Sequence, residues 1–264
     1  MHCPVAARTL LQTLYPVERR TCWATQRQRH HCSHAQYVDG MDGKKFEEIL
    51  AFMDIRKIGI MVLQDTRCPQ TQVRWLGEQL RKRLGRQAKL FNVEGRGSHS
   101  LPLSEKSTHL KVGGQMFLTN HALGIYTHDF SPDPTGLGVL SSITLSSKEA
   151  GLGVKIIGTY WPPANDLEGS LGQRLLSDPA FLRLNLRRGT DALTPKEYIQ
   201  ICINKISDSY CSKPHHLAIL AGDLNCSWDV APNKTPGSHG KGLKDWALAS
   251  SCRNPSTILG LGPH

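Results

Sequence analysis

The chain has 264 residues, a length that allows one large α/β domain or two small ones with a buried hydrophobic core. Its formal net charge of +10 and its isoelectric point near 9.3 favour a polyanionic partner, although charge alone does not identify one. No apolar run approaches the ~18 residues of a membrane-spanning helix, and the first residues lack the apolar stretch of a secretory signal. We therefore expect no membrane partner.

Eight cysteines without a CxxC pair indicate reduced thiols, which favours a nuclear or cytoplasmic protein. Residues 1–35 are basic and irregular, and we expect them to form an N-terminal extension: an arm, or a linker out of a longer polypeptide. An Arg-rich, acid-poor start is also typical of an organellar presequence. The cysteines and histidines of this extension match no zinc-finger spacing. Residues 36–264 are expected to form the globular part.

The first expected elements are a strand beginning at Ala35, an Asp39-Gly40 turn and an amphipathic helix. The helix is predicted because four apolar residues recur at positions i, i+3, i+4 and i+7, namely Phe46, Ile49, Leu50 and Met53. It leads into an apolar run, Ile60 to Leu63, that is followed closely by a carboxylate, Asp65. Since such a run is typical of a buried strand, Asp65 is expected at the rim of a sheet.

The next segment, residues 71–86, is predicted to be a helix with one apolar stripe and strongly basic remaining faces. A face of this kind is either ordinary solvated surface or a contact for the DNA backbone. Arg86 also lies on the basic face of this helix. The candidate nucleic-acid-binding residues in and just before this helix are Arg67, Arg74, Arg81, Lys82 and Arg83.

Residues 101–147 read as β structure, with one strand starting near Gly113 and another running from Gly136 to Leu145. A further apolar run from Val154 ends in Tyr160, before two prolines that stop the strand. A polar insertion is expected over residues 164–193. Thr194-Pro195-Lys196-Glu197 then forms a capping box, which predicts the start of another helix. After the last predicted strand, residues 243–250 outline a short helix.

That last strand is the apolar run Leu217 to Ala221, which Gly222 stops before Asp223 and Asn225. With one residue between them, Asp223 and Asn225 point to the same side of an extended chain. Two oxygen-bearing groups aimed at one place are able to share a hard cation or to orient a water molecule beside a phosphate. The alternative is an Asx turn that closes the strand.

Three motifs at strand ends, in this order, resemble the endonuclease/exonuclease/phosphatase superfamily, which includes apurinic-site endonucleases, DNase I and the endonucleases of non-LTR retrotransposons. The motifs are Gln64-Asp65-Thr66, Tyr160-Trp161-Pro162 and Gly222-Asp223-Leu224-Asn225. The resemblance covers roughly residues 36 to 252 and is most like a retrotransposon endonuclease. It implies an α/β fold, a four-layer α/β/β/α sandwich of the DNase I type.

The resemblance also implies roles for particular residues. Asp223 would orient or deprotonate the attacking water, Asn225 would bind a phosphate oxygen or Asp223, and Tyr160 would offer its hydroxyl to the phosphate or the water. Asp65, with Asp39, would hold Mg²⁺, with Mn²⁺ as an alternative. Taken alone, Tyr160 reads equally as an aromatic that fills the strand end, and Asp39 as part of a plain Asp-Gly turn.

The sequence departs from the family pattern at three places. Tyr37 stands where the family has an Asn, and Asp65 replaces a Glu, which shortens the reach of the carboxylate by about 1.5 Å. The family ends in further strands with a Ser-Asp-His motif, and no such motif follows Asn225, so we expect the closing C-terminal strands to be missing.

These features leave three hypotheses for the function. The first is a Mg²⁺-dependent DNA endonuclease of retrotransposon type, active or decayed, with the reverse transcriptase portion of a longer polypeptide as a candidate partner. The second is a non-catalytic nucleic-acid-binding remnant. The third is a phosphoesterase that acts on small molecules or lipids.

Overall fold

A computed structural model describes residues 32–38, 40–95, 113–147, 152–160, 171–178, 181–182, 194, 197–199, 201–205 and 216–223. Two four-stranded sheets form the centre of this part of the chain. The first contains β1 (Cys32–Tyr37), β2 (Ile58–Gln64), β3 (Lys89–Val93) and β4 (Gln115–Thr119). The second contains β5 (Thr127–Ser131), β6 (Leu140–Ser147), β7 (Leu152–Tyr160) and β8 (His216–Asp223). The helices are α2 (Gly43–Arg56), α3 (Gln70–Leu84), α4 (His121–Gly124) and α5 (Leu171–Leu176).

Both sheets are mixed. The strand orders are β1-β2-β4-β3 and β5-β6-β7-β8. β1 runs parallel to β2, and β7 runs parallel to β8, whereas the other neighbouring strands are antiparallel. Each parallel pair is joined by a crossover that contains a helix, as parallel strands require.

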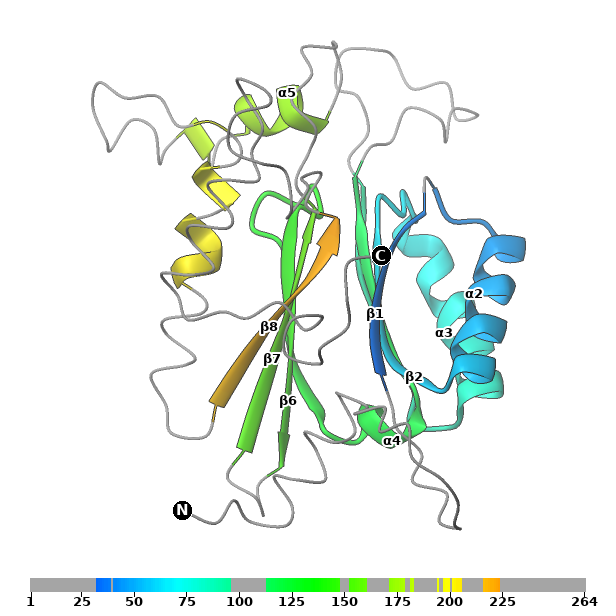
Figure 1. Ribbon diagram of the computed structural model, residues 1–264. Helices are drawn as coiled ribbons and strands as arrows, with labels where there is room; N and C mark the ends of the chain where they lie inside the picture. The colour runs from blue at the N-terminus through cyan, green and yellow to red at the C-terminus, as the bar shows by residue number, and fades with distance from the viewer. Residues whose placement is uncertain are drawn as a thin grey trace, which may run out of the picture.

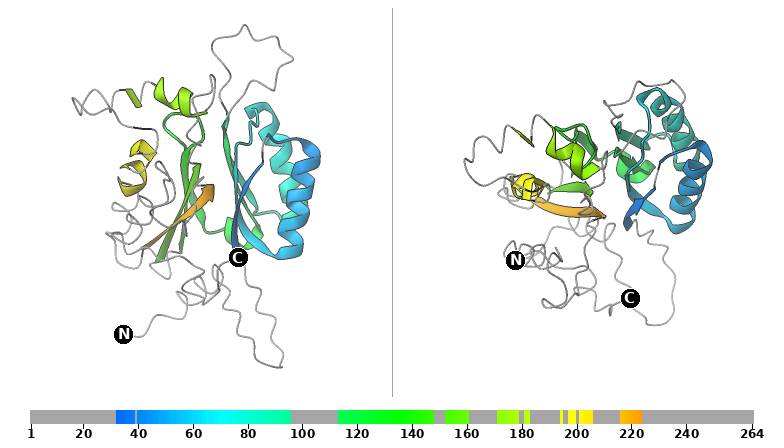
Figure 2. Two further views of the ribbon diagram at one scale, coloured as in Figure 1. Left: turned by 45° about the horizontal axis from the view of Figure 1, so that its top comes forward. Right: turned by 90° about the horizontal axis from the view of Figure 1, so that it is seen from above.

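The elements stack in four layers, α/β/β/α (Figures 1 and 2). α2 and α3 cover the outer face of the first sheet, and the helical residues 197–199 and 201–205 lie on the outer face of the second sheet (Figure 1). α5 lies over the upper end of the second sheet (Figure 1). Apolar side chains fill each of the three interfaces between layers. The expected four-layer sandwich is confirmed.

β2 shows why the apolar runs predicted buried strands. Its side chains alternate between two cores: Ile60 and Val62 lie between the sheets, and Met61 and Leu63 pack against α2 and α3. Because both faces are covered, the strand reads as a continuous apolar run and not as an alternating one.

The helix ends follow ordinary capping chemistry. The Asp42 side chain accepts a hydrogen bond from the Lys45 N–H at the start of α2 (2.8 Å), and Lys57 closes the helix in a left-handed conformation. The capping box at Thr194 is confirmed: the Glu197 N–H donates to Thr194 Oγ1 (3.3 Å), and the Thr194 N–H donates to Glu197 Oε2 (2.7 Å).

The structure differs from the sequence-based expectation at two strand starts. β1 begins at Cys32, before the expected Ala35. The expected strand start at Gly136 is wrong, since β6 begins at Leu140. Gly136 and Gly138 adopt φ values of 68° and 74°, and a Cβ on Gly138 would lie 2.6 Å from the backbone of Gly114, so these residues form a tight turn.

Two other expected segments are only partly covered or not covered. The helix expected at residues 243–250 lies outside the described residues, and the insertion at 164–193 contains α5. In the part of the chain that the structure describes, no helix has the length and apolarity needed to span a bilayer.

Candidate active site

Four parallel-running strands bring the predicted strand-end residues to one end of the sandwich. β1, β2, β7 and β8 all finish at the upper end in Figure 1. Asp65 follows β2, whereas Tyr160 and Asp223 are the last residues of β7 and β8 and face each other in register. Residues from distant parts of the sequence are thus assembled at the carboxyl ends of strands, where α/β proteins commonly bind ligands.

One backbone hydrogen bond connects the two sheets at this end, and a second one holds the end of β7 within its own sheet. The Gly114 N–H donates to the Leu137 carbonyl (2.7 Å), and the Tyr160 N–H donates to the Val139 carbonyl (2.9 Å). On its other side, Gly114 accepts from the Thr66 N–H (3.2 Å). The turn after β2 and the end of β7 are therefore held by the same pair of loops.

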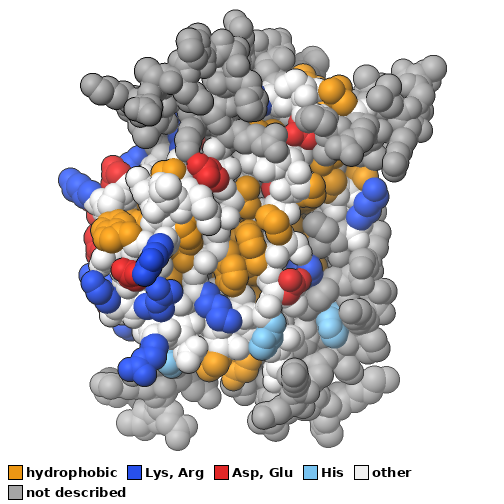
Figure 3. Space-filling view, turned by 180° about the vertical axis from the view of Figure 1, so that it is seen from behind, with side chains coloured by type: hydrophobic (Ala, Val, Ile, Leu, Met, Phe, Trp, Pro, Cys, Tyr) orange, Lys and Arg blue, Asp and Glu red, His pale blue; other side chains and the backbone are white. Residues whose placement is uncertain are grey.

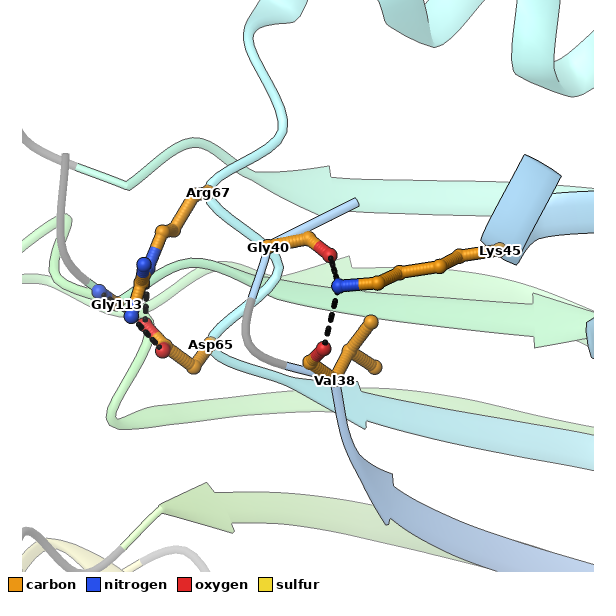
Figure 4. Close-up of polar contacts among 6 residues, drawn as sticks. All are labelled: Val38, Gly40, Lys45, Asp65, Arg67 and Gly113. Carbon is orange, nitrogen blue, oxygen red and sulfur yellow. Dashed lines mark hydrogen bonds and ion pairs between the residues drawn. The ribbon is translucent and has the colours of Figure 1, made fainter. Parts of the chain in front are cut away.

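The Asp65 carboxylate is buried and already paired. Arg67 Nη2 lies 2.6 Å from Asp65 Oδ2, and Arg67 Nε donates to Oδ1 over 3.3 Å. The Gly113 N–H donates to the same Oδ1 over 2.8 Å (Figure 4). Asp65 is 5% exposed, so hydrogen bonds from a guanidinium and a backbone amide replace the hydrogen bonds that this carboxylate would make with water. Arg67 was predicted to contact DNA, and in the structure its guanidinium forms an ion pair with Asp65.

Gly113 and Gly114, beside Asp65, stand where the neighbouring backbone leaves no room for a side chain. A Cβ on Gly113 would lie 2.1 Å from the Leu137 carbonyl oxygen, and one on Gly114 would lie 2.9 Å from the Gly95 nitrogen. Both glycines also have positive φ values, 74° and 88°. Only glycine fits here, and it lets a backbone N–H approach the buried carboxylate. The sequence predicted a strand start near Gly113, but it did not predict that the Gly113 N–H would donate to Asp65.

The loop between β1 and α2 is joined to the turn after β2. The Val38 N–H donates to the Gln64 carbonyl (3.1 Å), and the Gly40 N–H donates to the Asp65 carbonyl (2.8 Å). From α2, Lys45 Nζ donates to the carbonyls of Val38 (3.3 Å) and Gly40 (3.0 Å; Figure 4). Asp39 itself lies outside the described residues. Lys45 was not predicted, because a lysine in a first helical turn carries no distinctive sequence signal.

Tyr160 is 8% exposed and belongs to the apolar cluster beneath α5, with Leu171 and Leu175. Its ring fills the strand end, and its backbone places it beside Asp223. Asp223 is half-buried at the end of β8. Asn225 lies outside the described residues, so the spacing argument for Asp223 and Asn225 stays a prediction.

A second buried carboxylate, Asp133, organises the loop that holds Tyr160. It accepts hydrogen bonds from the Thr135 N–H (2.9 Å), the Thr135 hydroxyl (2.8 Å) and the Val139 N–H (2.7 Å). Burial raises the pKa of Asp133, and these hydrogen bonds oppose the rise. Sequence reasoning missed Asp133, although a Pro-, Gly- and Asp-rich stretch is a recognisable signal for such a turn.

The described residues do not form a metal site. No group of three or more His, Cys, Asp or Glu side chains able to hold an ion occurs among them. Asp65, the candidate ligand in this part of the chain, offers its oxygens to Arg67 and Gly113. The predicted Mg²⁺ or Mn²⁺ site at Asp65 therefore does not fit the geometry of this turn.

Most of the predicted basic residues lie away from this end. α3 runs antiparallel to β2 (Figure 1), which places its last turn, with Arg81, Lys82 and Arg83, at the other end of the sheet. This turn lies about 17 Å along the helix from the first turn near Asp65. Arg83 Nε lies 3.9 Å from Asp54 Oδ2, near the end of α2. We call this region the basic end; it comprises the exposed residues Arg56, Lys57, Arg81, Lys82, Arg83 and Arg86. Figure 3 shows Lys and Arg gathered on the helical side, toward the lower end.

Arg74 lies outside the basic end. It projects from the first half of α3, its side chain is 92% exposed, and its Nε lies 3.5 Å from Glu78 Oε1. Of the predicted nucleic-acid-binding residues, the structure thus groups Arg81, Lys82 and Arg83, and it separates Arg67 and Arg74 from them.

No protein-family model and no curated protein matches this sequence. Among solved structures, the AP endonuclease LMAP from Leishmania major aligns over 92% of this chain and 69% of that chain, with a TM-score of 0.50 and 16% identity. TDP2 from Caenorhabditis elegans aligns over 78% of this chain and 50% of that chain (TM-score 0.41, 13% identity).

An endonuclease/exonuclease/phosphatase from Beutenbergia cavernae aligns over 78% of this chain and 48% of that chain (TM-score 0.41, 17% identity). The chain spans about half the length of the TDP2 and Beutenbergia proteins. The similarity to the Leishmania enzyme confirms the DNase I-like fold.

Proposed function

We propose that this protein hydrolyses phosphodiester bonds in DNA at the end of the sandwich where β2, β7 and β8 finish, as an endonuclease of the retrotransposon type. The observation that carries the proposal is the convergence of Tyr160 and Asp223, which are register neighbours, at that end. The fold that produces this convergence is shared with an AP endonuclease.

Asp223 is the proposed general base. A carboxylate at the carboxyl end of a strand is suited to orient an attacking water and to accept its proton. Its register neighbour Tyr160 would donate a hydroxyl hydrogen bond to the phosphate or the water, which a neutral phenol does at pH 7. Asn225, two residues beyond Asp223, would donate to a phosphate oxygen.

Divalent metal dependence, with Mg²⁺ or Mn²⁺, is part of this proposal because of the sequence resemblance. The described residues do not form the site, so no step of the reaction is assigned to a metal ion. Asp39 is the remaining predicted carboxylate ligand.

DNA is the proposed partner because a formal net charge of +10 and the basic end favour a polyanion. The basic end would supply much of the electrostatic attraction, from the end of α3 that lies away from Asp65. A reverse transcriptase portion of a longer polypeptide is a further proposed partner, which follows from the retrotransposon resemblance.

A second candidate function is nucleic-acid binding without catalysis. It is favoured by the Asp65–Arg67 pair, because a carboxylate neutralised by a guanidinium does not present a vacant ligand for a metal ion. Salt-sensitive DNA binding without cleavage would identify this function.

The test is nicking of supercoiled plasmid by the full chain, in Mg²⁺, Mn²⁺ or EDTA, beside Asp223→Ala. We expect nicking that needs a divalent ion and that falls by about 10²-fold or more in the variant, because the general base is lost. Asp129→Ala, at an exposed aspartate on β5, is the matched control and should keep full activity. Absence of nicking by a folded wild-type chain that still binds DNA would support the non-catalytic function instead.

A further inference from the structure

The ion pair of Asp65 and Arg67 differs from the ion pairs on the helices. The side chains of Lys57–Asp54 and Arg74–Glu78 are each 45% to 92% exposed. The side chains of Arg67 and Asp65 are 28% and 6% exposed, respectively. Exposed pairs interact weakly, whereas a buried carboxylate needs a partner because its charge is poorly solvated.

The geometry of this pair resembles a fork on a carboxylate. Two guanidinium nitrogens of Arg67 donate to the two oxygens of Asp65: Nη2 to Oδ2 at 2.6 Å and Nε to Oδ1 at 3.3 Å. With the Gly113 N–H at 2.8 Å, at least three of the roughly four acceptor positions of the carboxylate are used. A metal ion would have to displace at least one of these donors.

The backbone fixes the pair in advance. Asp65 and Arg67 have φ values of 53° and 49°, a left-handed conformation that is uncommon for residues with a side chain. The Thr66 and Arg67 N–H groups donate to the carbonyls of Gly114 and Gly113, at 3.2 Å and 3.0 Å. Such a conformation persists where the surroundings determine it fully, so the turn holds Arg67 over Asp65.

We propose that Arg67 is the resident counter-ion of Asp65 and takes the place at this carboxylate that a divalent cation would take. Asp65 therefore binds neither Mg²⁺ nor Mn²⁺ while the pair is intact. The ion would have to lose part of its hydration shell and also expel a guanidinium that is already desolvated. An ion bound elsewhere in the chain leaves the pair unchanged, so this proposal does not rest on the proposed function.

The experiment measures Mn²⁺ binding to the full chain, from the loss of the free-ion signal in electron paramagnetic resonance. Arg67→Gln removes the counter-ion, and we expect it to bind Mn²⁺ about tenfold or more tightly than wild type, since one positive charge has left a neighbouring position. Adding Asp65→Asn to Arg67→Gln should return the affinity to the wild-type value. Arg83→Gln, which removes the guanidinium of a surface pair, is the matched control and should leave the affinity unchanged.

Two outcomes would overturn the proposal. One is a folded Arg67→Gln variant, checked by circular dichroism, that gains no Mn²⁺ affinity. The other is a wild-type chain that binds Mn²⁺ more tightly than Asp65→Asn alone, a comparison that remains decisive even if Arg67→Gln does not fold. No substrate is used, so neither result depends on whether the protein cleaves DNA.

Discussion

Two buried carboxylates near the candidate active site are stabilised in different ways. Asp65 and Asp133 are both 5% exposed. Asp65 pairs with the guanidinium of Arg67, whereas Asp133 accepts hydrogen bonds from neutral donors, the N–H and hydroxyl of Thr135 and the N–H of Val139. Neutral donors offset the loss of hydration only partly, which is why burial raises the pKa of Asp133.

Asp133 should therefore make stability depend on pH. Its pKa in the folded state lies above the unfolded value near 3.8, so the folded chain holds the proton more tightly in the interval between the two. The free energy of unfolding of wild type, relative to Asp133→Asn, is expected to fall as pH rises from about 4 through that interval. Urea denaturation at several pH values measures it.

Asp129→Asn is the control for this comparison, because Asp129 is an exposed aspartate on neighbouring β5. Its difference from wild type should change little over the same range. A wild-type advantage over Asp133→Asn that grows as pH rises would contradict the prediction.

At the scale of elements, the sequence predicted the strands that contain an apolar run, the edge strand β8 among them, and missed two edge strands that lack one. β2 and β7 contain apolar runs, but the edge strands β3 and β5 are mixed in character and only partly buried. α4 has four residues, too few to show a helical period. An apolar run or a helical period indicates burial, so two edge strands of mixed character and a helix of a single turn carry no such signal.

The interface between the sheets should be intolerant of added volume at Gly158. A Cβ there would lie 2.6 Å from Phe117 Cζ and 2.8 Å from Gln115 Nε2. Gly158→Ala is expected to lower the free energy of unfolding by about 1–3 kcal/mol, because overpacking forces neighbouring side chains out of place. Urea denaturation at neutral pH measures it.

Gly77→Ala is the matched control in the interior of α3. Its Cβ would meet the flexible Arg81 guanidinium at 3.5 Å, so the helix can accept it. Because glycine is a poor helix former, this change should stabilise the protein by up to about 1 kcal/mol. Equal effects of the two substitutions would show that the space between the sheets is not the cause.

At the scale of the molecule, the basic end and the predicted catalytic residues lie at opposite ends of the part of the chain that the structure describes. The sequence showed that the helix at 71–86 is basic, and the motifs showed which strand ends matter. It did not show that Arg81, Lys82 and Arg83 would lie far from Asp65, because that depends on the direction of α3 against the sheet. The pairing of Arg67 with Asp65 was also hidden, since it depends on two positive φ values.

The basic end should carry much of the affinity for DNA. Arg81→Ala/Arg86→Ala removes two of its charges and is expected to lower the slope of log affinity against log salt by up to about 2, because each phosphate that a basic side chain neutralises adds about 0.9 to that slope. Fluorescence anisotropy with a labelled duplex measures this. Lys44→Ala/Arg74→Ala removes two exposed charges toward the other end of α2 and α3 and should change the slope less. A larger loss of slope in Lys44→Ala/Arg74→Ala than in Arg81→Ala/Arg86→Ala would contradict the prediction, because it would mean that DNA binds at the opposite end.

The backbone bonds that continue past β1 and β2 have a consequence for ligand binding. The amides of Val38, Gly40 and Met41 donate to the carbonyls of Gln64, Asp65 and Thr66, so the sheet extends into the two connections beside the candidate site. Little conformational entropy is then left for a ligand to remove when it binds there. These two connections are therefore ordered before a ligand binds. If they opened, the amides of Val38, Gly40 and Met41 would lose their protection from hydrogen–deuterium exchange together.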